Sequence, residues 1–343
     1  MKETFGAKNR ALFGVYDGHG HVGHETAIFA RDNLPPSMKL TLEDFDRTQG
    51  KERSYDQALT DAHVATNEKL HKSPIDDAMS GTTSVTVLID KSDLTIMNLG
   101  DSRAIIASEL ESMRASRASA GDIDASKSPE GGARSGNTRL VAKALSYDQT
   151  PYRKDERERC KVAGARIMTM DQVSFLSVHT SLPRTDLVQI TRVAQTMHRP
   201  LNVCASLTVF PRFVAGCTGV AQIDGVEPLH ENFNTSLGDE LDEQGDPPRV
   251  WSKLGDYPGC AFTRSFGDME GERVGVFAEP EITKHSLRVN DRLIVIASDG
   301  VFEFLTNQQV VNLIKEYPDD PLMACRKVVS EAYQVSLGAR RPC

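Results

Sequence analysis

The chain has 343 residues, 39% hydrophobic and 26% charged, which suffices for one large domain or two small ones with a buried core. This composition excludes a disordered acidic tail, a collagen-like fibre and a small disulfide-stapled protein. The 40 basic and 48 acidic side chains give a net charge of −8 without a basic run, so we expect neither nucleic-acid nor membrane binding.

The first third of the chain predicts a strand, two helices and three more strands. Residues 11–16 are typical of a short buried strand that runs into a glycine-rich turn, and a helix is expected at about 22–33. The apolar spacing over 56–71 predicts a second helix. Three strand-like runs follow, at 82–89, 94–99 and 103–107. Gly100-Asp101-Ser102 predicts a tight, hairpin-like connection between the last two.

Two unusual segments interrupt the rest of the chain. Residues 108–137 are dominated by Ser, Arg, Ala, Gly and Glu, so we expect a disordered loop there. Residues 173–221 hold a single acidic residue and show no lasting periodicity, which indicates an atypical insertion. Ordered structure is expected to return at 139–146. The other expected elements are a helix at about 152–163, with Pro151 as its possible first residue and Gly164 at its end, a buried strand at 292–297, and helices near 306–316 and 320–336.

The cysteines and the N-terminus bear on the compartment. The six cysteines, at positions 160, 204, 217, 260, 325 and 343, form no CxxC pair and no metal-ligand spacing. We therefore expect free thiols in a reducing intracellular compartment, either cytoplasm or nucleus. No run reaches the ~20 apolar residues of a membrane helix, and no signal peptide is visible.

Four aspartates follow predicted strands or strand-like segments: Asp17, Asp101, Asp268 and Asp299. Asp17 and Asp299 each come directly after an apolar run, so a sheet can bring their carboxylates side by side. Oxygen donors with no cysteine nearby favour hard cations such as Mg²⁺ or Mn²⁺, and the glycine after each aspartate allows a sharp turn. The alternative is a set of ordinary Asp-Gly turns. The recurrence of the pattern, with a histidine after Asp17-Gly18, favours a metal site.

Three histidines follow closely on Asp17, namely His19, His21 and His24. Their spacing is not HExxH, which disfavours a zinc or copper site. His19 fits better as a proton donor beside a carboxylate-bound metal, whereas His21 and His24 are expected at a helix entry or on the surface. The sequence has no GxSxG elbow, phosphate-binding loop, kinase motif set or cysteine-phosphatase spacing.

Six segments form an ordered series of motifs: FGVYDGHG (13–20), SGTTSVTVLI (80–89), LTIMNLGDSRAII (94–106), ALSYDQTPYRKDERERCKVAGARI (144–167), PGCAFTRSFGDMEGERVGVFAEPEI (258–282) and RLIVIASDGVFEFL (292–305). This series resembles the metal-dependent serine/threonine phosphatases of the protein phosphatase 2C (PPM) type. The last three segments are similar in amino-acid sequence to the phosphatase domain that plants and algae fuse to cyclic-nucleotide-binding and protein kinase domains. The resemblance covers about 5–107, 138–171 and 228–335.

The resemblance implies one phosphatase domain over 1–343 with an α+β fold, in which two antiparallel β-sheets form a central sandwich flanked by helices. It implies a site for two Mg²⁺ or Mn²⁺ ions at one end of the sandwich. In that site Asp17 would bridge the ions, Gly18 would contribute its carbonyl, and His19 would be the general acid. The remaining matches are Asp299 as the second carboxylate ligand, Asp101 as a ligand of a third, weakly held ion, and Asp268 and Glu303 as supporting residues.

The implied reaction is hydrolysis of phosphoserine and phosphothreonine in proteins by a metal-bridging hydroxide. Phosphorylated proteins would be the substrates of a chain that we expect to be monomeric, with cyclic-nucleotide-binding or kinase domains in a longer parent protein. The phosphate-binding arginine, the N-terminal acidic pair and the C-terminal aspartate of the family have no counterpart here. We therefore expect a domain truncated at both end strands. The alternative is a catalytically weakened module of the same fold that binds or regulates partners.

The two places where family-like sequence stops share one junction. Both junctions read Gln-Val-Ser, at Gln172-Val173-Ser174 and at Gln334-Val335-Ser336. The Val-Ser after each break is what a retained intron beginning with GT would encode if it were translated. We hypothesise that 173–221 and the tail after Gln334 are such artefacts, with a lineage-specific insertion and a divergent tail as the alternative.

Overall fold

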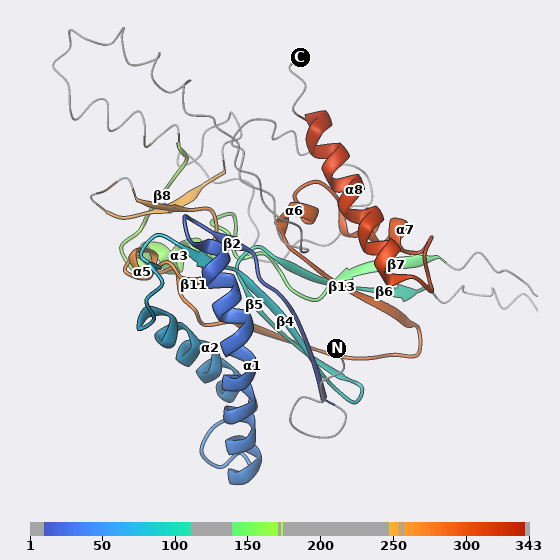
Figure 1. Ribbon diagram of the computed structural model, residues 1–343, viewed down its shortest axis with the longest axis horizontal. Coiled ribbons are helices and arrows are strands. Elements are labelled where there is room, and N and C mark those ends of the chain that lie inside the picture. The colour runs from blue at the N-terminus through green and yellow to red at the C-terminus, as the bar shows by residue number, and fades with distance from the viewer. Residues whose placement is uncertain are drawn as a thin grey trace, which may run out of the picture.

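The computed structural model describes residues 10–110, 139–170, 173 and 247–339, apart from 254 and 256. They form four layers, a pair of helices, two antiparallel sheets and a second group of helices (Figure 1). The expected α+β sandwich is confirmed. Of the predicted loop at 108–137, the part from 111 onward lies outside the described residues, and of the insertion at 173–221 only Val173 lies inside them.

The first sheet has the antiparallel strand order β1-β4-β5-β12. Its strands are β1 (Arg10–Val15), β4 (Ser84–Asp90), β5 (Asp93–Leu99) and β12 (Glu281–Ser286). Side chains alternate along the two central strands, so that Val87 and Ile96 face the second sheet while Leu88 and Met97 face the helices. Because both faces are covered, β4 and β5 have nearly continuous apolar sequences.

The second sheet has the order β13-β6-β7 and packs on the first. Its strands are β6 (Arg103–Glu109), β7 (Leu140–Ala144) and β13 (Asp291–Ala297). In β6, Ala104 and Ile106 contact the first sheet, whereas Ile105 and Ala107 contact the outer helices. The same alternation of the strand thus fills two separate cores.

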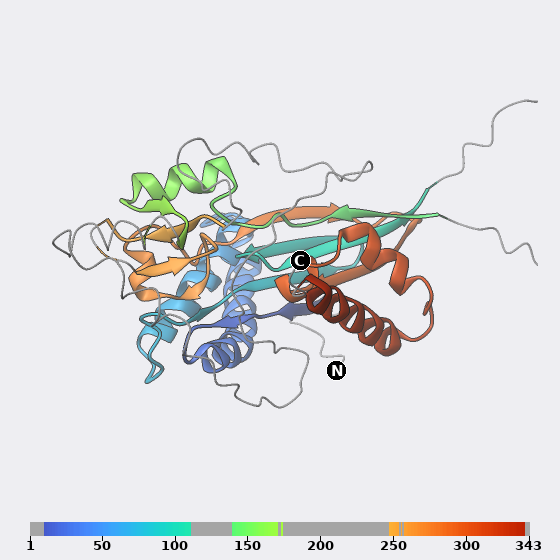
Figure 2. The same cartoon turned by 90° about the horizontal axis from the view of Figure 1, so that it is seen from above.

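Helices cover the outer faces of both sheets (Figure 2). The first sheet carries α1 (Gly23–Thr48) and α2 (Tyr55–His71), and the second carries α6 (Asp299–Phe302), α7 (Asn307–Ile314) and α8 (Pro321–Ala339). The helix predicted at 22–33 is longer in the structure, since α1 continues through Pro35 and Pro36. Leu34, Met38 and Leu42 bury one face across the two prolines, and this packing outweighs the backbone hydrogen bonds that proline cannot donate.

Two small sheets complete the structure beyond the sandwich. One has the order β11-β3-β2, with β2 (Gly18–His19), β3 (Gly81–Thr82) and β11 (Phe266–Gly267). The other has the order β10-β9-β8, with β8 (Arg166–Met168), β9 (Arg249–Trp251) and β10 (Pro258–Cys260). The short helices α3 (Lys154–Val162) and α5 (Met269–Glu272) lie with them. The first small sheet matters most for function, because it joins three of the sequence motifs.

Three details of the predicted elements were wrong. Gly100-Asp101-Ser102 is not a hairpin, because β5 belongs to the first sheet and β6 to the second, so the turn passes between sheets. The runs 11–16 and 292–297 are edge strands with no fully buried residue, and Phe13 is 53% exposed. The helix at 152–163 starts after Arg153 rather than at Pro151, which precedes it in a turn.

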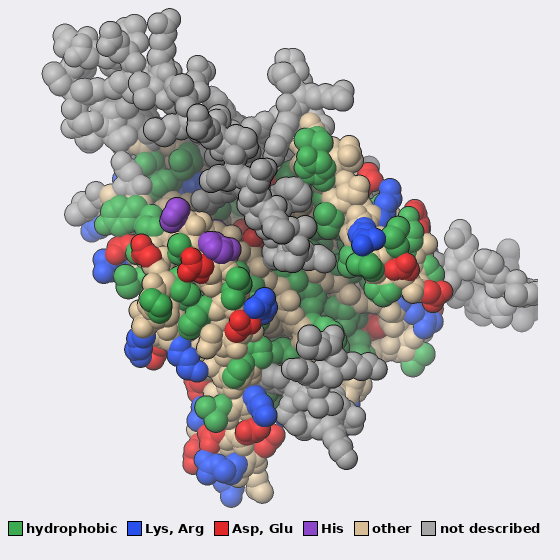
Figure 3. Space-filling model, in the orientation of Figure 1, with side chains coloured by type: hydrophobic (Ala, Val, Ile, Leu, Met, Phe, Trp, Pro, Cys, Tyr) green, Lys and Arg blue, Asp and Glu red, His purple; other side chains and the backbone are tan. Residues whose placement is uncertain are grey.

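The exposed surface mixes acidic and basic side chains, which lie interspersed over α1 and α2 in Figure 3. Several of these charges form ion pairs with neighbours on the same helix, as Lys39 does with Glu43. None of the helices within the described ranges combines the length and apolarity needed to cross a lipid bilayer.

Candidate active site

Three aspartates from separate strand ends come together at one end of the sandwich. Asp17 follows β1, Asp101 lies between β5 and β6, and Asp299 begins α6 just after β13. The side chains are near enough that each of the other two raises the pKa of Asp299, and Asp17 also shares a hydrogen bond with it. The structure therefore brings together the carboxylates that the strand-end pattern predicted.

Burial and like charge act together on this cluster. Burial, followed by the charges of Asp148 and Asp17, raises the pKa of Asp101 to about 7. Burial, followed by the charges of Asp101 and Asp17, raises the pKa of Asp299 well above its usual range. Carboxylates that repel each other in a partly dehydrated site strongly favour the binding of a cation, which relieves the repulsion.

Asp148 is a fourth acidic neighbour that the sequence analysis did not single out. Arg103 donates two hydrogen bonds to its carboxylate, from Nε at 2.8 Å and from Nη2 at 2.7 Å. The same guanidinium donates to Asn307 and lies 4.8 Å from the ring centre of Phe302, so it ties this loop to α6 and α7. Asp148 follows the end of β7 by four residues, and the strand-end criterion applied to Asp17 would have found it.

Close backbone packing fixes the turn that holds Asp17. The backbone N–H of Thr83 donates to the carbonyl of Asp17 at 2.9 Å, and the N–H of Asp17 donates to Thr83 Oγ1 at 3.2 Å. A Cβ on Gly18 would lie 2.0 Å from the carbonyl oxygen of Gly23, so only glycine fits there. The small sheet then places His19 opposite Gly81.

His19 and Asp268 form the second feature of the site. The ring nitrogen Nε2 of His19 lies 2.5 Å from Oδ2 of Asp268, although 249 positions separate the two residues. Asp268 was predicted only as a supporting residue, and its direct contact with His19 was missed because it depends on the pairing of β2, β3 and β11.

The remaining predicted residues lie at the margin of the cluster. Glu303 is exposed one turn after Asp299, and its charge also raises the pKa of that aspartate. His21 and His24 are exposed at the start of α1, as expected. The idea that Gly300 permits a sharp turn was wrong, because it lies inside α6, where an added Cβ would meet only Ser298 Oγ at 3.5 Å.

The donor set fits a hard divalent cation by its chemistry. Asp17, Asp101 and Asp299 supply carboxylate oxygens, and the exposed backbone of Gly18 directly follows Asp17 in the chain. Among the described residues, no group of three or more Asp, Glu, His or Cys side chains has the geometry to hold a metal ion. The fit therefore rests on the oxygen donors and on the mutual repulsion of their charges.

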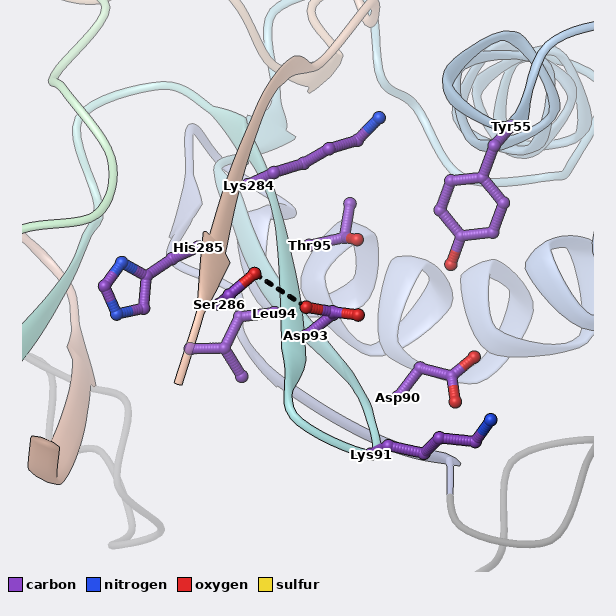
Figure 4. Close-up of a pocket in the computed structure, with 9 residues that line it drawn as sticks. All are labelled: Tyr55, Asp90, Lys91, Asp93, Leu94, Thr95, Lys284, His285 and Ser286. Carbon is purple, nitrogen blue, oxygen red and sulfur yellow. Dashed lines mark hydrogen bonds between the residues drawn. The ribbon is translucent and has the colours of Figure 1, made fainter. Parts of the chain in front are cut away.

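A polar hollow lies at the other end of the first sheet (Figure 4). Its lining comes from α2, the turn between β4 and β5, and β12, and includes a hydrogen bond of 2.8 Å from Ser286 to Asp93. Asp93 begins β5 whereas Asp101 follows its end, so the length of the strand separates this hollow from the acidic cluster.

The cysteines within the described residues take no part in the site. Cys160 and Cys260 are buried and Cys325 is exposed, and Cys160 and Cys325 are free thiols, as expected.

Comparison with known proteins places the chain in a family. The profile described as "Protein phosphatase 2C" matches residues 1–192 and 251–337. "Probable protein phosphatase 2C 35" of Arabidopsis thaliana is 34% identical over 98% of this chain and 71% of its own length. "Probable protein phosphatase 2C 64" of Oryza sativa subsp. japonica is 26% identical over 91% of this chain and 51% of its own.

Two solved structures have the same fold. A serine-threonine phosphatase 2C from Toxoplasma gondii superposes with a TM-score of 0.55 and 16% identity, covering 97% of this chain and 80% of its own. A C. elegans sex determining protein gives a TM-score of 0.53 and 16% identity, covering 96% of this chain and 54% of its own. With the family profile and the plant relatives, these likenesses show that the chain belongs to the protein phosphatase 2C (PPM-type) family of protein serine/threonine phosphatases.

Proposed function

We propose that this chain hydrolyses phosphoserine and phosphothreonine in proteins with two Mg²⁺ or Mn²⁺ ions held by Asp17, Gly18 and Asp299. Protein phosphatases of this family are generally metal-dependent, and their substrates are phosphoproteins. The observation that supports the proposal is the convergence of Asp17, Asp101 and Asp299 from three strand ends, where like charge raises the pKa of Asp101 and of Asp299.

Each residue has a distinct task in this proposal. Asp17 would bridge the two ions, Asp299 would complete the carboxylate pair, and Asp101 would bind a third ion more weakly. Divalent cations bound there lower the pKa of a water molecule and neutralise phosphate oxygens. His19 would protonate the leaving serine or threonine oxygen, and Glu303 would add negative charge beside Asp299.

A second candidate function is a catalytically weakened module that binds or regulates phosphoproteins. The observation in its favour is that no group of three or more metal-binding side chains in the described residues is already arranged around one ion. Such a module would keep the fold and the surface of the site but would turn over no substrate.

Hydrolysis of a phosphothreonine peptide separates the two candidates. We expect phosphate release that requires millimolar Mn²⁺ or Mg²⁺, stops on chelation and falls to background in Asp17→Asn. Asp93→Asn is the matched control, because it neutralises an exposed aspartate at the far end of β5. No release by the wild-type chain at millimolar Mn²⁺ would contradict the catalytic proposal and favour the binding module.

The domain organisation stays a prediction. We propose one phosphatase domain over 1–343, monomeric, with the segment 173–221 as an atypical insertion. Transcript sequencing tests the insertion directly. Reads that skip 173–221 and continue in family-like sequence after Gln334 would support a retained intron, and reads that encode the printed chain would refute it.

A further inference from the structure

The pair formed by His19 and Asp268 is buried and held from both sides. Their side chains are 16% and 3% exposed, and Nε2 lies 2.5 Å from Oδ2. Ser265 donates its hydroxyl to the same oxygen at 2.6 Å. Because this oxygen meets two partners, the carboxylate is held in one orientation and defines where Nε2 of His19 can lie.

The backbone around the pair is built to allow this contact. Asp268 adopts a left-handed conformation, with φ of 51°, and its N–H donates to the carbonyl of Ser80 at 2.9 Å. A Cβ on Gly81 would lie 2.3 Å from Asp268 Oδ2 and 2.7 Å from His19 Nε2. Asp268 is thus in a strained backbone conformation beside a position that only glycine can fill. Such conformational strain costs folding free energy and is typically retained at functional sites.

The ring of His19 also packs against an aromatic side chain and lies near the acidic cluster. The ring centre of Phe262, a buried residue, lies 4.3 Å away at an interplanar angle of 43°. The charge of His19 partly offsets the rise in the pKa of Asp101, so the imidazole lies within electrostatic reach of that carboxylate. The imidazole therefore contacts Asp268 directly and lies near Asp101 of the candidate active site.

We propose that Asp268 is a positioning residue, which fixes the orientation and tautomer of His19 so that Nδ1 faces the leaving oxygen of the phosphoester. The inference rests on the proposed phosphatase function of this site and deepens it. Asp268 accepts the Nε2–H bond throughout, and Nδ1 is the nitrogen that remains for proton transfer. An aspartate that orients a catalytic imidazole in this way is a known device in hydrolysis.

The proton balance of the step is simple. Water gives one proton to solvent and its oxygen forms a bond to phosphorus. The bond from phosphorus to the threonine oxygen breaks, and the electron pair of that bond stays on the threonine oxygen. The Nδ1 proton of protonated His19 moves to this oxygen and gives the threonine hydroxyl. Neutral His19 keeps its Nε2 proton on Asp268, and Nδ1 regains a proton from solvent after phosphate leaves.

Leaving-group dependence tests the proposal. A threonine alkoxide must be protonated as it leaves, whereas p-nitrophenolate leaves as the anion. In the Mn²⁺-loaded protein we expect His19→Gln to lower kcat on the phosphothreonine peptide about 10²–10⁴-fold. Asp268→Asn should lower it at least about tenfold with unchanged KM, because an amide donor at Nε2 favours the other tautomer. Both variants should lose less activity on p-nitrophenyl phosphate than on the peptide. Equal losses on both substrates, or no loss on the peptide, would overturn the proposal.

A similar trio at the opposite end of the second sheet supplies the matched control. Asp291 accepts from Nε2 of His285 at 2.9 Å and from Ser108 at 2.5 Å, at the start of β13. Asp291→Asn removes a buried histidine partner of the same type without touching the site. It should leave the ratio of the two kcat values unchanged, and a change like that of Asp268→Asn would count against a local role for Asp268.

Nitrogen NMR provides a readout that needs no activity. In ¹⁵N-labelled wild-type protein with Mg²⁺, we expect neutral His19, assigned by comparison with His19→Gln, to carry its proton on Nε2. A neutral ring protonated on Nδ1 would overturn the proposal even if Asp268→Asn does not fold. A wild-type chain that hydrolyses neither substrate would refute the proposed function, while the tautomer would still decide whether Asp268 fixes the ring.

Discussion

Replacing Asp101 by asparagine is expected to stabilise the metal-free protein at neutral pH. In the folded chain, burial and the charges of Asp148 and Asp17 raise the pKa of Asp101 to about 7 from its usual value of 3.8. The folded state therefore binds more protons than the unfolded state between these values, so this carboxyl lowers the free energy of unfolding as pH rises through the interval. Asparagine carries no charge and removes this pH dependence.

The size of the effect follows from the shift. About three pKa units correspond to at most about 4 kcal/mol, and partial exposure of the side chain reduces this, so we expect about 2–4 kcal/mol. The difference between Asp101→Asn and wild type should reach this value at about pH 7.5 and nearly vanish at about pH 3, where Asp101 is largely protonated in both the folded and the unfolded state. Saturating Mn²⁺ should narrow the difference, since only the folded wild-type site gains the full binding energy.

Urea unfolding with a chelator at the two pH values measures the difference directly. Asp93→Asn is again the control, because it removes a carboxylate from the other end of the same strand, and its effect should not change with pH in this way. A gap between Asp101→Asn and wild type that is the same at both pH values would refute the electrostatic reasoning.

Four substitutions test the surroundings of the site. His71→Gln should abolish a stabilisation that wild type loses between pH 6.5 and about 10, since the hydrogen bond to Asp77 is the main cause that raises the pKa of His71 to about 10; urea unfolding across this range checks it. Glu156→Gln should cost about 3–5 kcal/mol in the same assay, because this carboxylate is 2% exposed and its guanidinium partners would lose their counter-charge. Gly81→Ala should cost about 1–3 kcal/mol by crowding, whereas Gly300→Ala, with room for a methyl group, should change stability by under about 0.5 kcal/mol in thermal unfolding.

Much of the sandwich could be predicted because its central strands are buried on both faces. The apolar runs of β4, β5 and β6 and the helical spacing of α2 depend on local periodicity, which survives in any tertiary context. The strand-end positions of Asp17, Asp101 and Asp299 also depend on local sequence. Their convergence follows once the sheets form.

Other features depend on contacts between distant segments. The turn at Asp101 has hairpin composition, but the identity of the partner strand is decided by packing between sheets, so the predicted hairpin was wrong. The length of α1 is set by burial of Leu34 and Met38 against the first sheet rather than by its prolines. The contact of His19 with Asp268 needs three short strands in register, and two-residue strands leave no periodic signal.

The central claim is that Asp17 and Asp299 hold divalent cations at this end of the sandwich. Equilibrium dialysis of Mn²⁺ against the wild-type chain, Asp17→Asn and Asp299→Asn tests it without any substrate. We expect about two Mn²⁺ ions per wild-type chain and a loss of Mn²⁺ binding in both variants. Each variant should still unfold in a transition like that of wild type, which shows that it is folded. Mn²⁺ binding that is equal in all three proteins, or absent from the wild-type chain, would contradict this claim.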